Sequence, residues 1–492
     1  MKRVISVLLT VCVILACAPL TGVAAGNAPA GVVAQSGENY PFVLIRGIAF
    51  DGLYANYGTD RQEKAIKPIT AGDVLSTLGK AAAAGIVHRS MDKAVDEVIG
   101  YAREIFEKLG CNKDGTSTYD IGLPRYPLSA AHYMEELITG GGTGAEEGML
   151  KSAADRYGAD NVYYFTYDWR MNPLDICDEI NDMINLALAE HHTDKVNLLN
   201  CSMGGIETIA YLSKYGYGKI NKCVFLCSTF YGLDIVSDVF SGKVSVEEEA
   251  LYAFLDEKTE TSPALHFAVE VSNKAGLLKL VSSLANRFID RYKDKVFDEA
   301  LRDTFGTMPV WWGLTRPDAY EEAVDYIFGG HEEEYADLIA IGDDLQAMMA
   351  GRDRLLKEAA ANGVQFAVVA NYNNAMPPVT ERALANSDGG LETALVSGGA
   401  VVADYGKTLG DDYVPSNPAY LSPDRVIDAS TCLFPDCTWF VKDAGHVASN
   451  YGSEYSDFLF WIVDFDGRPT VWQNPQYPQF MKSGREQNLD VF

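Results

Sequence analysis

The chain has 492 residues, of which 48% are hydrophobic and 22% charged, and its 40 Lys and Arg against 68 Asp and Glu give a net charge of −28. This composition supports a large hydrophobic core and excludes a disordered or fibrous protein. Because so negative a surface repels phosphates, we expect no nucleic-acid partner and no electrostatic docking on strongly anionic lipid.

The N-terminus has the pattern of a secretory signal. Two basic residues precede an apolar run over residues 4–20, and small residues follow at 23–25. This order predicts a signal peptide over residues 1–25. Lipidation at Cys17, in a loose bacterial lipobox, is the alternative. Either processing route predicts a secreted or cell-surface protein.

Cysteine spacing gives no sign of a disulfide scaffold or a metal site. Cys432 and Cys437 flank a short loop and could form a local disulfide, whereas Cys223 and Cys227 fall on one face of a core strand and are expected to be buried thiols. We therefore expect no metal and no cofactor.

Short apolar runs alternate with helical patterns along the chain. Strands are expected at 41–48, 161–167, 195–200, 219–228, 364–370 and 438–441. Helices are expected at 91–109, after Asn172-Pro173, after Ser202 and over about 455–462. This alternation predicts an α/β protein with a mostly parallel, doubly wound sheet and right-handed crossovers.

Two long segments interrupt this alternation. Residues 232–362 are helical and charged, with a strand suggested only near 310–312, and residues 57–150 form another insertion. Without both segments and the signal peptide, about 243 residues remain, which suits one sheet. We expect a core in two parts, 26–233 and 363–492, with a helical insertion at about 57–150 and a large helical cap at 234–362.

The junction after the strand at 195–200 has the features of a nucleophile. Residues 200–205 read Asn-Cys-Ser-Met-Gly-Gly, so Ser202 stands at a strand-to-helix turn with small residues behind it. Such a turn exposes the hydroxyl, and the helix start offers N–H groups to an oxyanion. The alternatives are an ordinary helix N-cap serine and, less favoured, Cys201 as nucleophile. We predict Ser202 as the nucleophile.

A base and an acid are expected later in the chain, because a triad on such a sheet runs Ser, acid, His. His446 is the only histidine after residue 331 and follows the strand at 438–441 directly. For the acid, Asp411 follows Gly410 in a turn that could hold a carboxylate with backbone amides. Three further aspartates remain open as alternatives: Asp412, Asp404 and Asp428.

Two further roles concern the oxyanion and the acyl group. The backbone N–H groups of Ile48 and Met203 are expected to form the oxyanion hole. Trp311 and Trp312, with other cap aromatics such as Phe267, could bind the acyl chain, although an apolar stripe at helical spacing is more often the cap's own core.

These motifs resemble the α/β-hydrolase lipases, and among them the lecithin:cholesterol acyltransferase and lysosomal phospholipase family. The resemblance rests on Tyr-Asp-Trp-Arg at 167–170, on residues 200–205, on Ser-Thr-Phe-Tyr-Gly-Leu at 228–233, and on 410–414 with His446. It covers the core and, loosely, residues 308–312 of the cap. It implies an α/β-hydrolase fold and acyl-ester substrates.

The sequence thus predicts a secreted, cofactor-free serine hydrolase of acyl esters that works through an acyl-enzyme. Its expected partners are an acyl ester or lipid substrate and, transiently, a lipid surface. Hydrolysis and acyl transfer both remain open. The alternatives are a non-lipid esterase or peptidase of the same fold, and a catalytically inactive binding protein on that fold.

Overall fold

The computed structural model describes residues 40–50, 52–68, 76–77, 80–81, 83, 90–139, 147–446, 453–484 and 488–492. The expected signal peptide and Cys17 lie outside these residues. Within them, no helix is both long and apolar enough to cross a membrane.

The centre of the molecule is an eight-stranded sheet in the order β13-β12-β11-β8-β7-β6-β1-β5. All neighbouring strands are parallel except β12 and β13. The strands are β1 (Phe42–Ile45), β5 (Val162–Phe165), β6 (Val196–Cys201), β7 (Ile220–Leu226), β8 (Gln365–Tyr372), β11 (Thr438–Lys442), β12 (Phe480–Ser483) and β13 (Leu489–Val491). The predicted α/β class with a mostly parallel sheet is confirmed.

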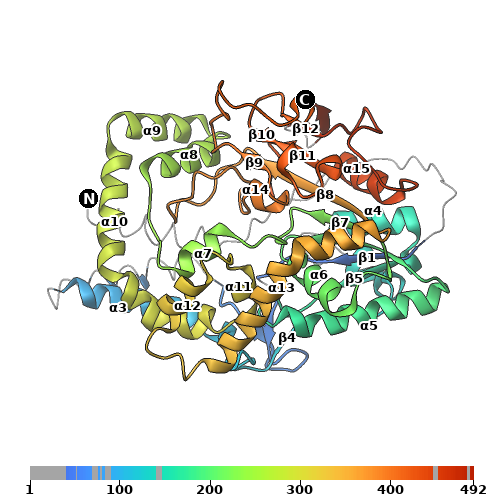
Figure 1. Cartoon of the computed structure of the whole chain (residues 1–492). Helices are drawn as coiled ribbons and strands as arrows, with labels where there is room; N and C mark the ends of the chain where they lie inside the picture. The colour runs from blue at the N-terminus through green and yellow to red at the C-terminus, as the bar shows by residue number, and fades with distance from the viewer. Residues whose placement is uncertain are drawn as a thin grey trace.

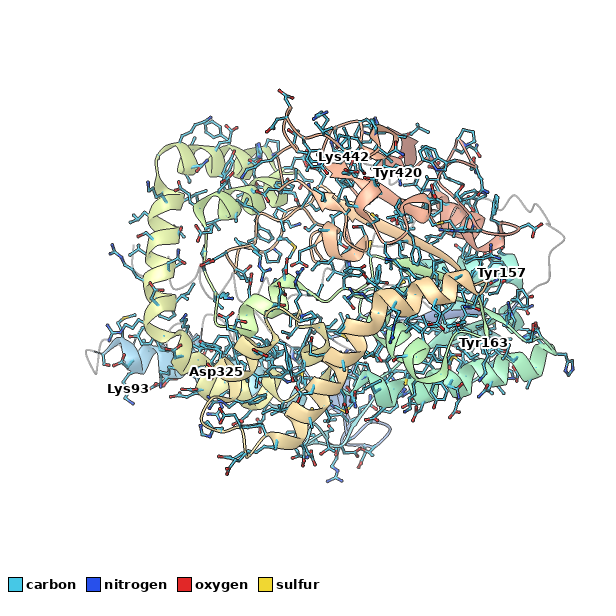
Figure 2. The ribbon with its side chains drawn as sticks, in the orientation of Figure 1. Lys93, Tyr157, Tyr163, Asp325, Tyr420 and Lys442 are labelled. Atoms are coloured by element: carbon cyan, nitrogen blue, oxygen red, sulfur yellow. The ribbon has the colours of Figure 1, made fainter. Side chains whose placement is uncertain are left out.

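Helices cover both faces of this sheet, which explains why its inner strands are apolar on both sides. Figure 1 shows α4 (Glu147–Tyr157) and α15 (Ser453–Asp464) on one face, and α5 (Pro173–His191), α6 (Gly204–Tyr215) and α13 (Ala336–Ala361) on the other. The hydroxyl of Tyr157, a residue labelled in Figure 2, donates a hydrogen bond of 2.8 Å to Asp464, which ties α4 to α15.

The chain between β7 and β8 is helical. It forms α7 (Asp234–Phe240), α8 (Glu248–Thr259), α9 (Pro263–Lys274), α10 (Leu277–Val296), a π-helix (Phe297–Gly306), α11 (Pro309–Leu314), α12 (Tyr320–Phe328) and α13. The strand suggested near residues 310–312 is wrong, because Pro309 occupies the first turn of a helix there. These helices bury a hydrophobic cluster of their own around Trp312.

The segment at 57–150 is not purely helical. It contains α3 (Met91–Phe106), but β3 (Glu63–Lys64) and β4 (Ile121–Gly122) flank β2 (Tyr54–Ala55) in a small antiparallel sheet. After β8 come the short helix α14 (Thr393–Val396) and a two-stranded antiparallel sheet of β9 (Val401–Val402) and β10 (Ile427–Asp428).

The cysteines among the described residues are buried or half-buried free thiols. Cys223 and Cys227 are buried, as predicted. The suggested disulfide between Cys432 and Cys437 is absent, because the Cys437 thiol lies 3.1 Å from the Pro469 carbonyl oxygen and 3.0 Å from Arg468 Nε.

Candidate active site

Four parallel strands, β1, β6, β8 and β11, end at one edge of the sheet, and each leads into a segment with a candidate residue. Ile48 follows β1, Ser202 follows β6, Asp388 lies in the loop after β8, and His446 follows β11. The order of the chain through the sheet reverses between β1 and β6, and such a switch point is where open parallel sheets bind ligands.

The turn at Ser202 is strained and crowded. Ser202 has a φ of 50°, a left-handed conformation that a residue with a side chain seldom adopts. A Cβ atom on Gly47 would lie 2.7 Å from Ser202 Cβ, and a Cβ on Gly205 would lie 2.7 Å from the Thr229 nitrogen. The small residues around Ser202 therefore allow close backbone approach from two directions.

This geometry separates the turn from an ordinary helix cap. The N-cap residue of α6 is Met203, and no side chain caps the helix there. The Ser202 hydroxyl instead lies 2.9 Å from Nε2 of His446. The structure therefore brings together the serine and the histidine singled out from the sequence.

The partner of His446 is Asp388. Nδ1 of His446 lies 2.7 Å from Oδ2 of this aspartate, whose side chain is fully buried. The other carboxylate oxygen, Oδ1, accepts hydrogen bonds from the N–H groups of Gly390 at 2.9 Å and Leu391 at 2.7 Å. A carboxylate held this way favours the imidazole tautomer that donates from Nδ1, which leaves Nε2 free to accept the serine proton.

Asp411 does not take this place, and the choice of acid is corrected. Asp411 and Asp412 are exposed in a turn, and Asp404 pairs with Lys407 at 3.3 Å. Asp428 accepts the Tyr413 hydroxyl at 2.8 Å. None of these four carboxylates is bonded to the histidine.

The sequence did contain a signal for the missed residue. Residues 386–390 read Asn-Ser-Asp-Gly-Gly, the typical composition of a turn in which an aspartate accepts backbone N–H groups. This turn is closer than Gly410 to the end of β8, the strand that precedes the acid in the predicted order Ser, acid, His.

Side chains from β8 and the loop after it support the histidine loop. Asn371 donates from Nδ2 to the Gly445 carbonyl at 2.9 Å and accepts the Tyr455 hydroxyl at 2.5 Å. Asn374 donates to the Ala444 carbonyl at 2.8 Å. Two amides thus fix the backbone directly before His446.

The expected oxyanion donors flank the serine. Met203 follows it, and Gly47, next to Ile48, packs against the Ser202 side chain. Within the described residues, neither the Ile48 nor the Met203 N–H has an acceptor in the protein. Both N–H groups are therefore available to a substrate oxygen, as an oxyanion hole requires.

The two tryptophans differ in position. Trp312 is 1% exposed, donates to the Gly306 carbonyl at 2.9 Å and packs in the cap's own cluster. Its assignment as a substrate-binding residue is therefore withdrawn. Trp311 is half-buried and lies edge-on to Trp169 with ring centroids 6.0 Å apart, at the contact between cap and core. Phe267 lies at the surface, 66% exposed.

Asp168 and Arg170 form a buried structural pair. Arg170 Nε lies 2.9 Å from Asp168 Oδ1, and the guanidinium also donates to the Leu109 carbonyl and the Ser117 hydroxyl, each at 2.9 Å. Through its bonds to Leu109 and Ser117, Arg170 joins the segment at 57–150 to the core. Because its side chain is fully buried, it does not face a substrate.

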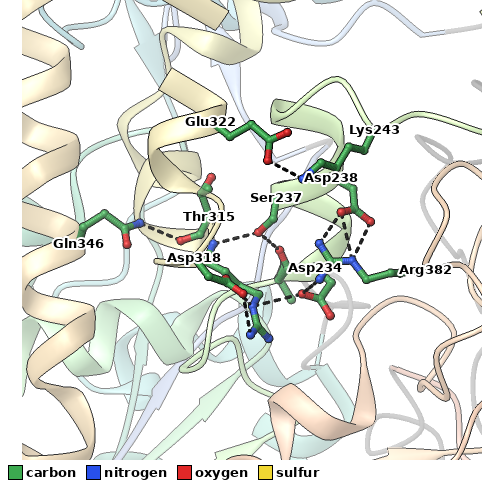
Figure 3. Close-up of polar contacts among 11 residues, drawn as sticks. Asp234, Ser237, Asp238, Lys243, Thr315, Asp318, Glu322, Gln346 and Arg382 are labelled. Carbon is green, nitrogen blue, oxygen red and sulfur yellow. Dashed lines mark hydrogen bonds and ion pairs between the residues drawn. The ribbon is translucent and has the colours of Figure 1, made fainter. Parts of the chain in front are cut away.

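An ionic cluster ties the cap to the loop that carries Asp388. Arg382 contacts Asp234 at 2.6 Å and Asp238 at 3.0 and 3.1 Å, both on α7 (Figure 3). Glu392, four residues after Asp388, accepts the Ile235 N–H at 3.0 Å, and burial raises the pKa of its carboxyl to about 7. The first cap helix and the acid loop are thus held together by side chains of both.

Among the described residues, no group of three or more His, Cys, Asp or Glu side chains is arranged to hold a metal ion. No protein-family model and no curated protein sequence matches the chain. Among solved structures, the crystal structure of the Tle4-Tli4 complex aligns with a TM-score of 0.29 and 11% identity, over 68% of this chain and 75% of that one.

Proposed function

We propose that the protein is an α/β-hydrolase-fold serine hydrolase that cleaves acyl esters through an acyl-enzyme. The observation that carries the proposal is the chain of short contacts from Ser202 Oγ to His446 Nε2, 2.9 Å, and from His446 Nδ1 to Asp388 Oδ2, 2.7 Å. This constellation activates a serine hydroxyl in unrelated hydrolases, so it supports nucleophilic catalysis more specifically than the sequence motif does.

The first half-reaction follows from the geometry. His446 Nε2 takes the proton of Ser202 as Oγ attacks the ester carbonyl carbon, while the carbonyl oxygen becomes an oxyanion between the N–H groups of Ile48 and Met203. The imidazolium is stabilised by Asp388 and then protonates the leaving alkoxide. The ester C–O bond breaks, and the acyl group remains on Ser202.

The second half-reaction repeats these roles with water. His446 takes a proton from water as the water oxygen attacks the acyl carbon. His446 then gives this proton to Ser202 Oγ as the carboxylic acid product departs. An alcohol in place of water would give acyl transfer by the same steps. Trp311 and the cap are the parts of the chain from which acyl-chain selectivity would come.

The test compares the wild type with Ser202→Ala on p-nitrophenyl esters of increasing chain length. We expect the wild type to hydrolyse them and the variant to be inactive, with an unchanged thermal unfolding midpoint because a small side chain is exchanged at a turn. Full turnover by Ser202→Ala would refute the proposal. Preference among the esters would separate a long-chain lipase from a non-lipid esterase.

A further inference from the structure

The carbonyl oxygen of Ser202 accepts hydrogen bonds from the segment that follows β7. The Thr229 N–H donates to it at 2.9 Å, and the Thr229 hydroxyl donates to it at 3.3 Å. The Gly205 N–H, in the first turn of α6, donates to the same oxygen at 3.1 Å. One buried residue outside the nucleophile turn therefore supplies two of the three donors described for this carbonyl.

The direction of this carbonyl determines the direction of a candidate oxyanion donor. The C=O of Ser202 and the N–H of Met203 belong to one peptide group, which is planar and trans, so the two bonds point in opposite directions. The Met203 N–H therefore points away from Thr229, and no acceptor for it lies among the described residues. Whatever fixes the Ser202 carbonyl also aims the Met203 N–H.

The nucleophile turn depends on contacts with its surroundings, because its backbone is strained. Ser202 follows β6 with a φ of 50°, and Cys227 follows β7, the neighbouring strand, with a φ of 44°. Residues with a side chain persist in this left-handed region only where the surrounding structure holds them. Two adjacent strands thus end in strained residues, and the contact between Ser202 and Thr229 joins the two turns.

A second contact joins the same two segments. The Ser228 hydroxyl donates to Oδ1 of Asn200 at 2.6 Å, and both side chains are fully buried. Asn200 stands two residues before Ser202, where the common pattern G-x-S-x-G has glycine. Its Nδ2 lies 3.9 Å from the Cys223 thiol. The asparagine is thus accommodated by β7 and the turn after it, and its bond to Ser228 holds the adjacent Thr229 against the nucleophile turn.

We propose that Thr229 is a positioning residue that aims the Met203 N–H at the oxyanion, with the hydrogen bond between Ser228 and Asn200 holding Thr229 in place. The proposal rests on the proposed function, because the oxyanion forms on the ester attacked by Ser202. A donor in the oxyanion hole must point at the oxygen of the tetrahedral intermediate. Loosening the peptide should therefore weaken binding of the transition state more than binding of the ester, so kcat falls while KM changes little.

The experiment compares Thr229→Val with Thr229→Ser in steady-state hydrolysis of a p-nitrophenyl ester. Valine has nearly the shape of threonine but removes the hydroxyl that donates to the Ser202 carbonyl, whereas serine keeps it. Complete removal of an oxyanion donor costs about 100- to 1000-fold in kcat, so we expect a misdirected donor in Thr229→Val to cost about tenfold, at a KM close to that of the wild type. Thr229→Ser should stay close to the wild type. Ser228→Ala should also lower kcat, because Oδ1 of Asn200 loses its donor.

A trifluoromethyl ketone supplies a readout that a structural role alone would not move, because its adduct with a serine carries an oxyanion. We expect its Ki to rise in Thr229→Val by the factor by which kcat/KM falls, since both report stabilisation of the oxyanion. Thr438→Val is the matched control. Thr438 is fully buried, donates its hydroxyl to the Phe434 carbonyl at 2.9 Å and begins β11, at the opposite end of that strand from His446. This control should keep the wild-type kcat and Ki.

Wild-type kcat in both Thr229→Val and Ser228→Ala would overturn the proposal. Equal losses in Thr229→Val and Thr438→Val would also overturn it, as would a lower kcat with an unchanged Ki, since the loss would then not lie in the oxyanion. Unfolding midpoints verify that each variant folds. An inactive wild type would refute the proposed function itself, whereas an active wild type with unaffected variants would refute only the role of Thr229.

Discussion

Replacing Asp388 by asparagine should disable the histidine through its tautomer. Oδ1 of Asp388 accepts two backbone N–H groups, from Gly390 and Leu391, so the asparagine oxygen must occupy that side. Its NH₂ group then faces His446 Nδ1 at the position of Oδ2. Nδ1 becomes the acceptor, the imidazole proton moves to Nε2, and Nε2 can no longer accept the proton of Ser202.

A triad with the wrong tautomer loses about 10⁴-fold in kcat, which corresponds to about 5.5 kcal/mol of transition-state stabilisation. The assay is steady-state hydrolysis of a p-nitrophenyl ester by Asp388→Asn, with Asp411→Asn as the matched control. Asp411 is exposed and not bonded to the histidine, so its variant should keep wild-type kcat. A loss below tenfold in Asp388→Asn, or a large loss in Asp411→Asn, would refute the assignment of the acid.

Three further changes test other parts of the account. Gly47→Ala should lower kcat at least about 100-fold with little change in stability. The added Cβ would lie 2.7 Å from Ser202 Cβ and would displace the nucleophile and the oxyanion donors. A wild-type kcat in this variant would contradict the expectation. Trp312→Ala should lower the free energy of unfolding by about 3–5 kcal/mol in urea titrations, whereas Trp311→Ala should weaken turnover of long-chain esters more than turnover of acetates. A stable Trp312→Ala variant with a selective loss on long-chain esters would restore Trp312 as a substrate contact. Glu392 binds its proton more tightly in the folded state, since burial raises its pKa from 4.5 to about 7. Its contribution to stability is therefore complete below pH 4.5 and is lost as the pH rises through 7. In urea titrations, the wild type should therefore lose stability relative to Glu392→Gln between pH 4.5 and pH 8. An equal change in the free energy of unfolding of both proteins between these pH values would exclude this.

The nucleophile and the base could be predicted because each lies beside a recognisable strand. Ser202 follows β6 directly and His446 comes four residues after β11, so short-range patterns placed both at the same sheet edge. Asp388 is separated from β8 by an irregular stretch of fifteen residues, and turns containing aspartate and glycine recur after it. Only the fold of that loop selects Asp388 over Asp411.

Helical periodicity left a second ambiguity. A pattern of apolar residues indicates that a helix has an apolar face, but not what that face contacts. Trp312 turned out to belong to the cap's own core, whereas Phe267, on a similar helical pattern, is exposed to solvent. Local sequence could not separate these cases, because neighbouring helices of the cap decide which face is covered.

The most direct test of the central claim is covalent labelling with a fluorophosphonate probe, followed by peptide mass spectrometry. An activated serine displaces fluoride from phosphorus and keeps the phosphonyl group, which an ordinary serine does not do. The account predicts one labelled peptide, with the adduct on Ser202, and labelling that is abolished in His446→Ala. No adduct on the wild type, or an adduct on another residue that persists in Ser202→Ala, would contradict it.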